Sequence, residues 1–162
     1  MAKSDIPVTP AIRVLRQHNA TFELVEYDYE EKGGTRRSST CLGVDEHAVV
    51  KTLVLEVAET KAPFIILMHG DREISTKQMA RVLNVKTVQL CNPETANKHT
   101  GYMVGGTSPF GTRKELPIYA EATIFELPEI WINAGRRGLL ARMPPANLET
   151  ILKAQRVSVA TV

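Results

Sequence analysis

The chain has 162 residues, of which 43% are hydrophobic and 23% charged, and its formal net charge is +2. This balance excludes a disordered chain, and no apolar run approaches the length of about 18 residues that a transmembrane helix needs. A charge this small is not that of a general nucleic-acid coat, so any contact with a polyanion must be local. The length fits one domain, and we expect residues 1–162 to fold as a single unit.

The cysteines and the first residues indicate the compartment. Cys41 and Cys91 are too few and too far apart for a disulfide framework or a zinc site, which agrees with a reducing environment. Residues 1–8 lack the apolar stretch of a secretory signal. We therefore expect a cytoplasmic protein with no membrane contact.

The first elements are a helix and a strand. Thr9 and Pro10 predict a helix over 10–17, because threonine is a good N-cap and proline fits the first helical position. Residues 22–29 are rich in aromatic and apolar side chains and indicate a strand.

A polar segment follows. Residues 30–39 contain two adjacent glycines and indicate a plain surface loop, with a lid over a site as the alternative. Residues 41–44 end a short helical turn, and Asp45 can cap another turn over 46–49.

Two apolar runs, 50–57 and 64–69, are predicted to be paired strands. Lys51 lies inside the first run, and a lysine is seldom fully buried there without a partner. A lysine held on a core strand is well positioned for chemistry. A lysine on an edge strand that discourages aggregation is an equally good interpretation.

The middle of the chain carries two helix start signals. Ser75 or Thr76 can cap a helix through residue 83. The residues of this helix expected to face inward are Met79, Val82 and Leu83. Asn92 and Pro93 open a further short helix.

The C-terminal part is predicted to hold three strands and a closing helix. The strands are expected over 116–119, 129–133 and 139–143, and the helix over 147–155. Helices and strands are thus mixed without a regular alternation, which indicates an α+β fold rather than a doubly wound sheet.

Residues 100–117 contain four of the ten glycines, and two cations come shortly after the last of these glycines. The four glycines are Gly101, Gly105, Gly106 and Gly111, and the cations are Arg113 and Lys114. Glycines let a ligand approach backbone N–H groups, and successive amides in turns form anion sites. We call residues 105–109 the amide loop. A tight connection between strands, with no ligand, is the alternative.

A second cationic turn, Gly135-Arg136-Arg137-Gly138, separates two predicted strands, and we call it the arginine turn. The four histidines show no pair at metal-ligand spacing, so we expect no metal and no cofactor. Neither a Gly-x-Ser-x-Gly elbow nor a Walker pattern is present. Ser108 has no identifiable base, so hydrogen bonding by its hydroxyl is a better interpretation than nucleophilic attack.

The remaining set is a strand lysine, an amide loop, an arginine turn and a tyrosine late in an early strand. Such a set holds anions and polarises carbonyl groups, which suits electrostatic stabilisation in acyl transfer. Water or the substrate itself would then be the attacking group.

These motifs resemble the YbaK/EbsC family of aminoacyl-tRNA deacylases, stand-alone relatives of the editing domain of some bacterial prolyl-tRNA synthetases. The resemblance covers most of the chain. It is carried by Thr9-Pro10-Ala11, the strand at 22–27, Val50-Lys51-Thr52-Leu53, the run from Thr100 to Gly111, and Gly135-Arg136-Arg137-Gly138-Leu139.

The resemblance implies a mixed, barrel-like sheet flanked by helices, and hydrolysis of mischarged Cys-tRNA(Pro) without a metal or a protein nucleophile. It implies that Lys51 holds the terminal adenosine or the ester carbonyl region, and that the amide loop binds the aminoacyl group and the ribose hydroxyls. The catalytic residues are then Lys51, Gly105 and Gly106. The substrate-binding residues are Tyr27, Thr107, Ser108, Pro109, Arg136, Arg137 and Gly138.

The implied partners are the acceptor end of an aminoacyl-tRNA and prolyl-tRNA synthetase. One departure concerns specificity, because Leu140 stands where Cys-specific relatives carry an aspartate soon after the arginine turn. Editing of alanine or another small amino acid is therefore an alternative. A non-catalytic module that binds tRNA or the synthetase is another.

Overall fold

The computed structural model describes residues 6–161, so residues 1–5, on which part of the expectation about a secretory signal falls, lie outside it. The helices are α1 (Pro10–Gln17), α2 (Gly34–Leu42), η2 (Glu46–Ala48), α3 (Thr76–Leu83), α4 (Pro93–Thr100), η3 (Ala122–Glu126) and α5 (Ala146–Thr150), where η marks a 3₁₀ helix. The strands are β1 (Glu23–Glu26), β2 (Val49–Val57), β3 (Pro63–His69), β4 (Glu73–Ile74), β5 (Val88–Leu90), β6 (Ile118–Glu121), β7 (Ile130–Arg136), β8 (Leu139–Met143), β9 (Gln155–Val157) and β10 (Ala160–Thr161). None of the described helices is long and apolar enough to cross a bilayer.

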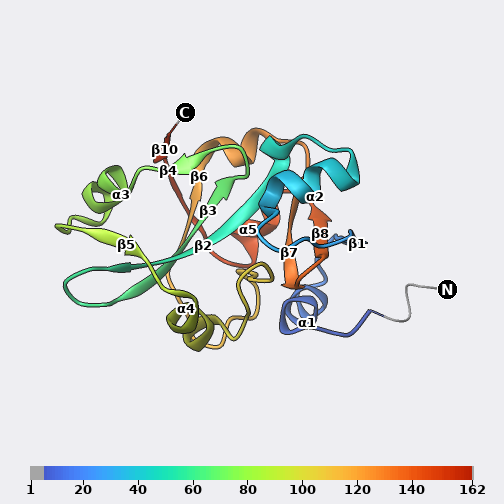
Figure 1. Cartoon of the computed structure of the whole chain (residues 1–162), viewed down its shortest axis with the longest axis horizontal. Helices are drawn as coiled ribbons and strands as arrows, with labels where there is room; N and C mark the ends of the chain where they lie inside the picture. The colour runs from blue at the N-terminus through green and yellow to red at the C-terminus, as the bar shows by residue number, and fades with distance from the viewer. Residues whose placement is uncertain (1–5, 162) are drawn as a thin grey trace.

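The main sheet has the strand order β1-β8-β7-β2-β3-β6-β9, with β5 paired to β2 outside this path and β4 paired to β10 in a small separate sheet. The long strand β2 runs parallel to β7 and antiparallel to β3, so the sheet is mixed. Figure 1 shows α3 and β5 at one end of the long axis and α1, α2 and β1 at the other. The α+β prediction is confirmed.

The expected barrel-like closure is not found among residues 6–161. The sheet path ends at β1 and at β9. Both are short edge strands of 4 and 3 residues, which pair along one side only.

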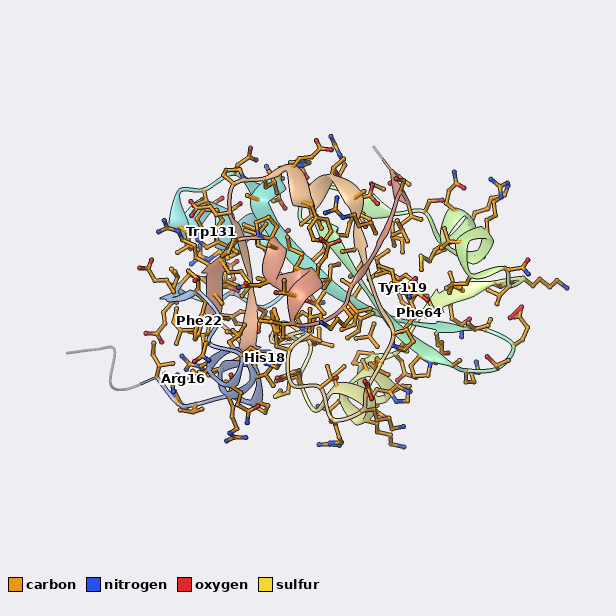
Figure 2. The ribbon with its side chains drawn as sticks, turned by 180° about the vertical axis from the view of Figure 1, so that it is seen from behind. Arg16, His18, Phe22, Phe64, Tyr119 and Trp131 are labelled. Atoms are coloured by element: carbon orange, nitrogen blue, oxygen red, sulfur yellow. The ribbon has the colours of Figure 1, made fainter. Side chains whose placement is uncertain are left out.

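Two apolar clusters pack on the sheet because alternate residues of β2 point to opposite faces. Val50 and Val54 belong to the larger cluster, and Leu55 and Val57 to the smaller one. In the smaller cluster the rings of Phe64 and Tyr119 meet edge to face at 5.8 Å (Figure 2).

The predicted helix starts are confirmed by their capping bonds. The side chains of Thr9, Ser75 and Asn92 accept hydrogen bonds from the backbone N–H groups three residues on. Asp45 likewise accepts the N–H of His47 and caps η2.

The loop predicted over 30–39 is wrong in its second half, which forms α2. The polar sequence has low intrinsic helix preference, but Ser38 and Ser39 are buried at 2% and 6% exposure, so tertiary packing overrides it. Arg37 also reaches back to the carbonyl oxygen of Asp28 at 3.0 Å. The helix ends at Gly43, whose φ of 69° only glycine adopts readily.

Two other predictions fail locally. Val82 is 49% exposed rather than inward-facing, and the buried positions of α3 are Met79 and Ala80. The closing helix stops at Thr150 instead of Gln155, because Lys153 takes a left-handed conformation with φ of 58° and β9 follows.

Candidate functional site

The amide loop and the arginine turn touch through their backbones. A Cβ atom on Gly106 would lie 2.9 Å from the backbone nitrogen of Arg137 and 3.0 Å from the carbonyl carbon of Arg136. These distances are shorter than real Cβ contacts, so only glycine permits this approach. The loop and the turn, predicted separately, therefore form one structural unit.

Asn133, in the middle of β7, ties this unit together. Its Nδ2 donates to the carbonyl oxygens of Gly105 at 3.1 Å and Arg136 at 3.2 Å. Its Oδ1 accepts from the backbone N–H groups of Gly135 at 2.7 Å and Arg136 at 3.2 Å. The amide side chain thus uses all its hydrogen-bonding capacity to hold the amide loop against the arginine turn.

Tyr29 contacts the amide loop more directly than the predicted Tyr27. A side chain on Gly105 would meet the Tyr29 hydroxyl. The guanidinium of Arg137 lies 5.4 Å from the centre of the Tyr29 ring, and its Nε donates to the carbonyl oxygen of Val104 at 2.9 Å. Tyr29 and Arg137 therefore brace the start of the loop together.

Tyr27 lies against the other end of the arginine turn. Its backbone N–H donates to the carbonyl oxygen of Gly138 at 2.9 Å. Burial raises the pKa of the Tyr27 hydroxyl, and the neighbouring Tyr29 and Cys41 raise it further. The hydroxyl therefore remains a neutral donor at physiological pH.

Lys51 reaches the same region through strand register. Val49 pairs with Trp131 in the parallel β2–β7 ladder, and Lys51 and Asn133 each follow two residues later on the same face. Adjacent strands lie about 4.8 Å apart. The paired stretch ends at Val50 and Ile132, so Lys51 and Asn133 are each the next residue of their strand beyond it. The Nζ of Lys51 lies 3.5 Å from Oε1 of Glu73.

Leu140 lies on the same face of the sheet as Asn133, on strand β8, which flanks β7 on the side opposite to β2. It pairs with both Asn133 and Val25 across the sheet, is only 4% exposed, and belongs to neither core cluster. The wall beside the clamp is therefore apolar, and no carboxylate stands at this position.

The remaining amide-loop residues differ in exposure. Ser108 is fully buried, and its Oγ accepts the N–H of Phe110 at 3.2 Å. The hydroxyl of Thr107 donates to the carbonyl oxygen of Met103 at 3.3 Å, and Pro109 is buried. None of the hydrogen bonds found within residues 6–161 uses the backbone N–H of Thr107 or Ser108.

Tyr102 closes the segment that carries the amide loop. Its hydroxyl donates to the carbonyl oxygen of Phe110 at 2.6 Å. Burial raises the pKa of Tyr102 to about 12, so this hydroxyl stays protonated and the bond persists at neutral pH. The loop is therefore fixed at both ends.

The structure does not bring every predicted residue to the loop by a direct contact. Arg136 forms an ion pair with Glu26, with Nη2 2.7 Å from Oε2, so its charge is partly compensated. Lys51 is adjacent by register, but its ammonium group is paired with Glu73. Asn133 and Tyr29 were missed by sequence reasoning, because nothing in a lone asparagine or tyrosine indicates a partner 28 or 76 residues away.

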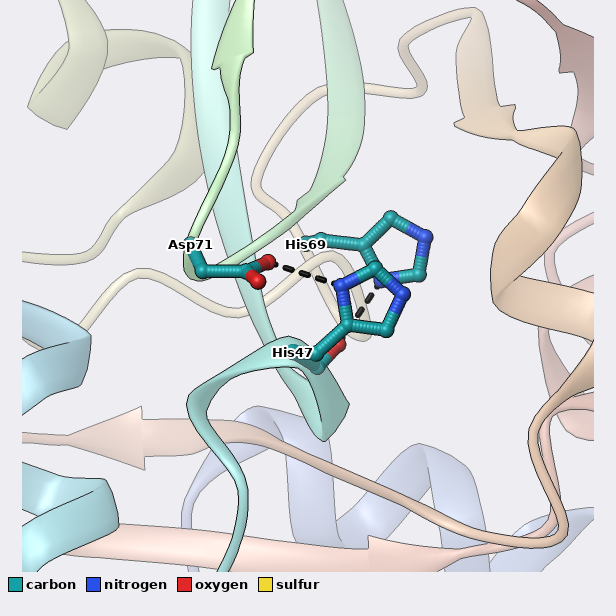
Figure 3. Close-up of side chains that lie close together, drawn as sticks. All are labelled: His47, His69 and Asp71. Carbon is teal, nitrogen blue, oxygen red and sulfur yellow. Dashed lines mark hydrogen bonds and ion pairs between the residues drawn. The ribbon is translucent and has the colours of Figure 1, made fainter. Parts of the chain in front are cut away.

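A histidine cluster lies at the start of β2 and was also missed, because its members are 22 and 24 residues apart along the chain. His47 and His69 stack at 3.7 Å between ring centroids, and the Nδ1 of His47 lies 2.8 Å from Oδ1 of Asp71 (Figure 3). The atoms of these three residues that could ligate a metal ion lie within 4.8 Å of one another. No local pattern in the sequence indicates this grouping.

Hydrogen bonds account for the geometry of this cluster. Nδ1 of His69 lies 2.7 Å from the carbonyl oxygen of His47, and Nε2 lies 2.7 Å from the hydroxyl of Thr123. Burial lowers the pKa of His69, which favours the neutral ring, with Nδ1–H as donor and Nε2 as acceptor. Both ring nitrogens of His69 are thus engaged in hydrogen bonds.

The chain is similar in sequence and in fold to proteins that are already known. The family model described as "Aminoacyl-tRNA editing domain" matches residues 34–151. This span contains Lys51, the amide loop and the arginine turn, whereas Tyr27 and Tyr29 precede it.

Two curated relatives are similar in sequence. EbsC of Enterococcus faecalis, to which deacylation of Cys-tRNA(Pro) and Cys-tRNA(Cys) is ascribed, is 27% identical over 94% of this chain and 93% of its own. A proline–tRNA ligase of Thermodesulfovibrio yellowstonii is 28% identical over 68% of this chain. The match covers only 18% of the ligase, so the chain corresponds to one segment of that protein.

Among solved structures, one ascribed to a trans-editing enzyme for prolyl-tRNA synthetase superposes with a TM-score of 0.82. It is 22% identical and covers 96% of this chain and 100% of its own. At this identity the likeness establishes the fold.

Proposed function

Because this chain belongs to the family of aminoacyl-tRNA editing domains, we propose that it is a trans-editing deacylase. It hydrolyses the ester that joins a wrong amino acid to the terminal nucleoside of a tRNA, and the substrate we propose is Cys-tRNA(Pro). The similarity to EbsC along nearly the full length of both chains supports this choice. We also propose a cytoplasmic location and a single domain over residues 1–162.

The observation that carries the proposal is the backbone N–H of the half-buried Thr107, which makes no hydrogen bond within residues 6–161. It belongs to a loop that Asn133, Tyr102 and Arg137 hold in place. A preorganised amide of this kind stabilises the negative oxygen that develops when an ester carbonyl is attacked, and one donor contributes about 3 kcal/mol. In this proposal the scissile carbonyl oxygen points at the N–H of Thr107.

Lys51 supplies the positive charge on the other side of the ester. Its partner Glu73 is 81% exposed, and exposed ion pairs contribute little, about 0.2 to 1 kcal/mol. The ammonium group can therefore leave Glu73 and bind the terminal nucleoside or the ester carbonyl. Lys51 and Asn133 each follow directly after the paired stretch of β2 and β7, which supports the proposal that the lysine side chain extends from there to the amide loop.

The attacking group comes from outside the protein. Ser108 is fully buried with its hydroxyl engaged, and burial raises the pKa of the Cys91 thiol to about 11, so neither side chain is an activated nucleophile. Water can attack the ester carbonyl, breaking the bond to the ribose oxygen, which takes up a proton. Alternatively, the substrate thiol attacks its own ester, releases the ribose hydroxyl, and leaves a cyclic thioester that water then opens.

The amino-acid side of the site is apolar because Leu140 faces it next to Asn133. An apolar wall accepts small uncharged side chains such as those of cysteine and alanine. It separates them weakly, because one small group changes binding by about 1 to 3 kcal/mol. Editing of alanine is therefore the second candidate.

Recognition of the tRNA would involve its acceptor end, with Arg137 and the cations after the amide loop contacting phosphates. Selectivity for tRNA(Pro) would come from docking on prolyl-tRNA synthetase. The similarity to a segment of proline–tRNA ligase supports a functional connection with that enzyme.

The test is release of labelled amino acid from tRNA(Pro) charged with cysteine, alanine or proline. Release of cysteine alone supports the proposal, and release of alanine alone supports the second candidate. Binding of tRNA with no release from any substrate would overturn both and indicate a non-catalytic module.

A further inference from the structure

An open groove of about 450 Å³ lies beside the amide loop. One wall is formed by Asn97 and Lys98 of α4, and the other by Met103, Val104 and Arg137. This volume lies within the range of about 300 to 1,000 Å³ for small-ligand sites. The groove is continuous with the candidate site, because Val104 is bonded directly to Gly105.

Two apolar side chains are held out to solvent in this groove. Met103 is 60% exposed and Val104 is 52% exposed. Their backbones are fixed, because the carbonyl oxygen of Met103 accepts the N–H of Gly106 at 2.8 Å and that of Val104 accepts Nε of Arg137 at 2.9 Å. Adjacent exposed apolar residues on a fixed backbone form a preformed contact surface.

The surroundings of the groove are mainly cationic. Lys98 and Arg137 line it, and Glu94 is its one acidic lining residue. Backbone hydrogen bonds from Arg113 to Thr100 and from Lys114 to His99 bring two further cationic residues to the end of α4. A polyanion that also carries an apolar group would complement such a surface.

We propose that this groove binds the nucleotide that precedes the esterified terminal nucleoside in the single-stranded 3′ end of tRNA. This inference rests on the proposed function, because it places the terminal nucleoside at the amide loop. The base of the preceding nucleotide lies on Met103 and Val104, and Lys98 contacts its phosphate. Single strands are generally recognised by bases stacked on flat aromatic side chains with their phosphates against cations. In this groove the exposed apolar side chains of Met103 and Val104 take the place of the aromatic rings.

The first experiment measures binding and needs no catalysis. Two ligands are titrated: a fluorescent oligonucleotide that ends in CCA and carries no amino acid, and adenosine monophosphate. Each is titrated against the wild type, the double variant Met103→Ser/Val104→Ser and Lys98→Gln. Matched controls are Val82→Ser, also an exposed valine, and Lys77→Gln, also an exposed helix lysine, both on α3.

The expected result is about tenfold weaker binding of the oligonucleotide by the double variant, with unchanged binding of adenosine monophosphate. Lys98→Gln is expected to lower the slope of log affinity against log salt by about 0.7, the value for one phosphate contact on a single strand. The α3 controls should behave as wild type. The proposal would be overturned if the groove variants and the controls lost affinity equally, or if the double variant bound both ligands equally more weakly. It would also be overturned if the wild type did not bind the oligonucleotide.

A second experiment separates this inference from the proposed function. Hydrolysis of the cysteinyl ester of adenosine is compared with that of the cysteinyl ester of a CCA trinucleotide. The double variant should raise KM only for the trinucleotide ester. Absence of hydrolysis for both esters would refute the proposed deacylase activity, while the binding result would still stand. If the double variant lost binding to prolyl-tRNA synthetase but bound the oligonucleotide as the wild type does, the groove would be reassigned to a protein partner.

Discussion

Asn133 holds Gly105 through a hydrogen bond of 3.1 Å from its Nδ2 to the glycine carbonyl oxygen, although the two residues are 28 positions apart. The same side chain bonds three backbone groups of the arginine turn. The orientation of the amide loop therefore depends on one amide side chain in the middle of β7.

We predict that Asn133→Asp lowers kcat for ester hydrolysis about tenfold to a hundredfold, because a small displacement of a positioned group has effects of this size. The carboxylate keeps the acceptor but cannot donate to Gly105, so the unfolding free energy should fall by about 1 to 3 kcal/mol. Denaturant melts and steady-state kinetics measure both effects. Asn147→Asp is the matched control, since Asn147 donates to the carbonyl oxygen of Thr21 at 3.0 Å outside the site, and it should lose stability without losing kcat.

Gly106→Val tests the contact between the amide loop and the arginine turn. The new Cβ would lie 2.9 Å from the backbone nitrogen of Arg137, so the loop must move away. We expect kcat to fall and KM to rise, with a folded protein in circular dichroism. Unchanged KM and kcat in this variant would show that the loop is only a structural connection.

Glu73→Gln tests whether the ion pair restrains Lys51. The amide removes the negative charge 3.5 Å from Nζ, so the lysine becomes more available to substrate. We predict a decrease in KM of about twofold to threefold, as expected for release of an exposed ion pair, with little change in thermal stability. Glu149→Gln, which breaks the exposed pair with Arg156, should leave KM as in the wild type.

The histidine cluster predicts a pH dependence of stability. Burial lowers the pKa of His69 in the folded protein, so between the folded pKa and the ordinary value of about 6.5 the unfolded chain binds more protons. The stabilising contribution is therefore complete above about pH 6.5 and is lost as pH falls toward the folded pKa.

Thermal melts between pH 8 and pH 5 measure this effect. His69→Gln should be less stable than the wild type at neutral pH but should show a flatter decline with acid. Burial also lowers the pKa of His99, so His99→Gln is the comparison that separates the two histidines. A wild-type decline that His69→Gln does not alter would contradict the assignment.

Local signals in the sequence were sufficient for most elements. Caps at Thr9, Ser75 and Asn92 act within three residues, and the apolar runs of β2 and β3 predict strands by composition. The strands β4, β5, β9 and β10 have two or three residues each and show no usable periodicity. Only the C-terminal end of helix α2 was predicted, as the helical turn that ends at 41–44, because the stability of the helix comes from packing against the rest of the chain.

In the candidate site, too, the features with a local sequence signal could be predicted and those that depend on distant contacts could not. Lys51, the amide loop and the arginine turn stand out as local motifs. Their meeting does not, since it depends on the β2–β7 register and on Asn133. The ion pair of Arg136 with Glu26 and the contact of Tyr29 with Gly105 also join distant segments and carry no local signal.

We propose that Lys51 and the amide loop together promote hydrolysis of an aminoacyl ester. Release of labelled cysteine from Cys-tRNA(Pro) tests this proposal when it is measured for the wild type, Lys51→Ala and Lys77→Ala, the last changing an exposed lysine on α3. We predict rapid release by the wild type and Lys77→Ala, and no release above the uncatalysed rate by a folded Lys51→Ala. Release by Lys51→Ala at the wild-type rate would contradict the account.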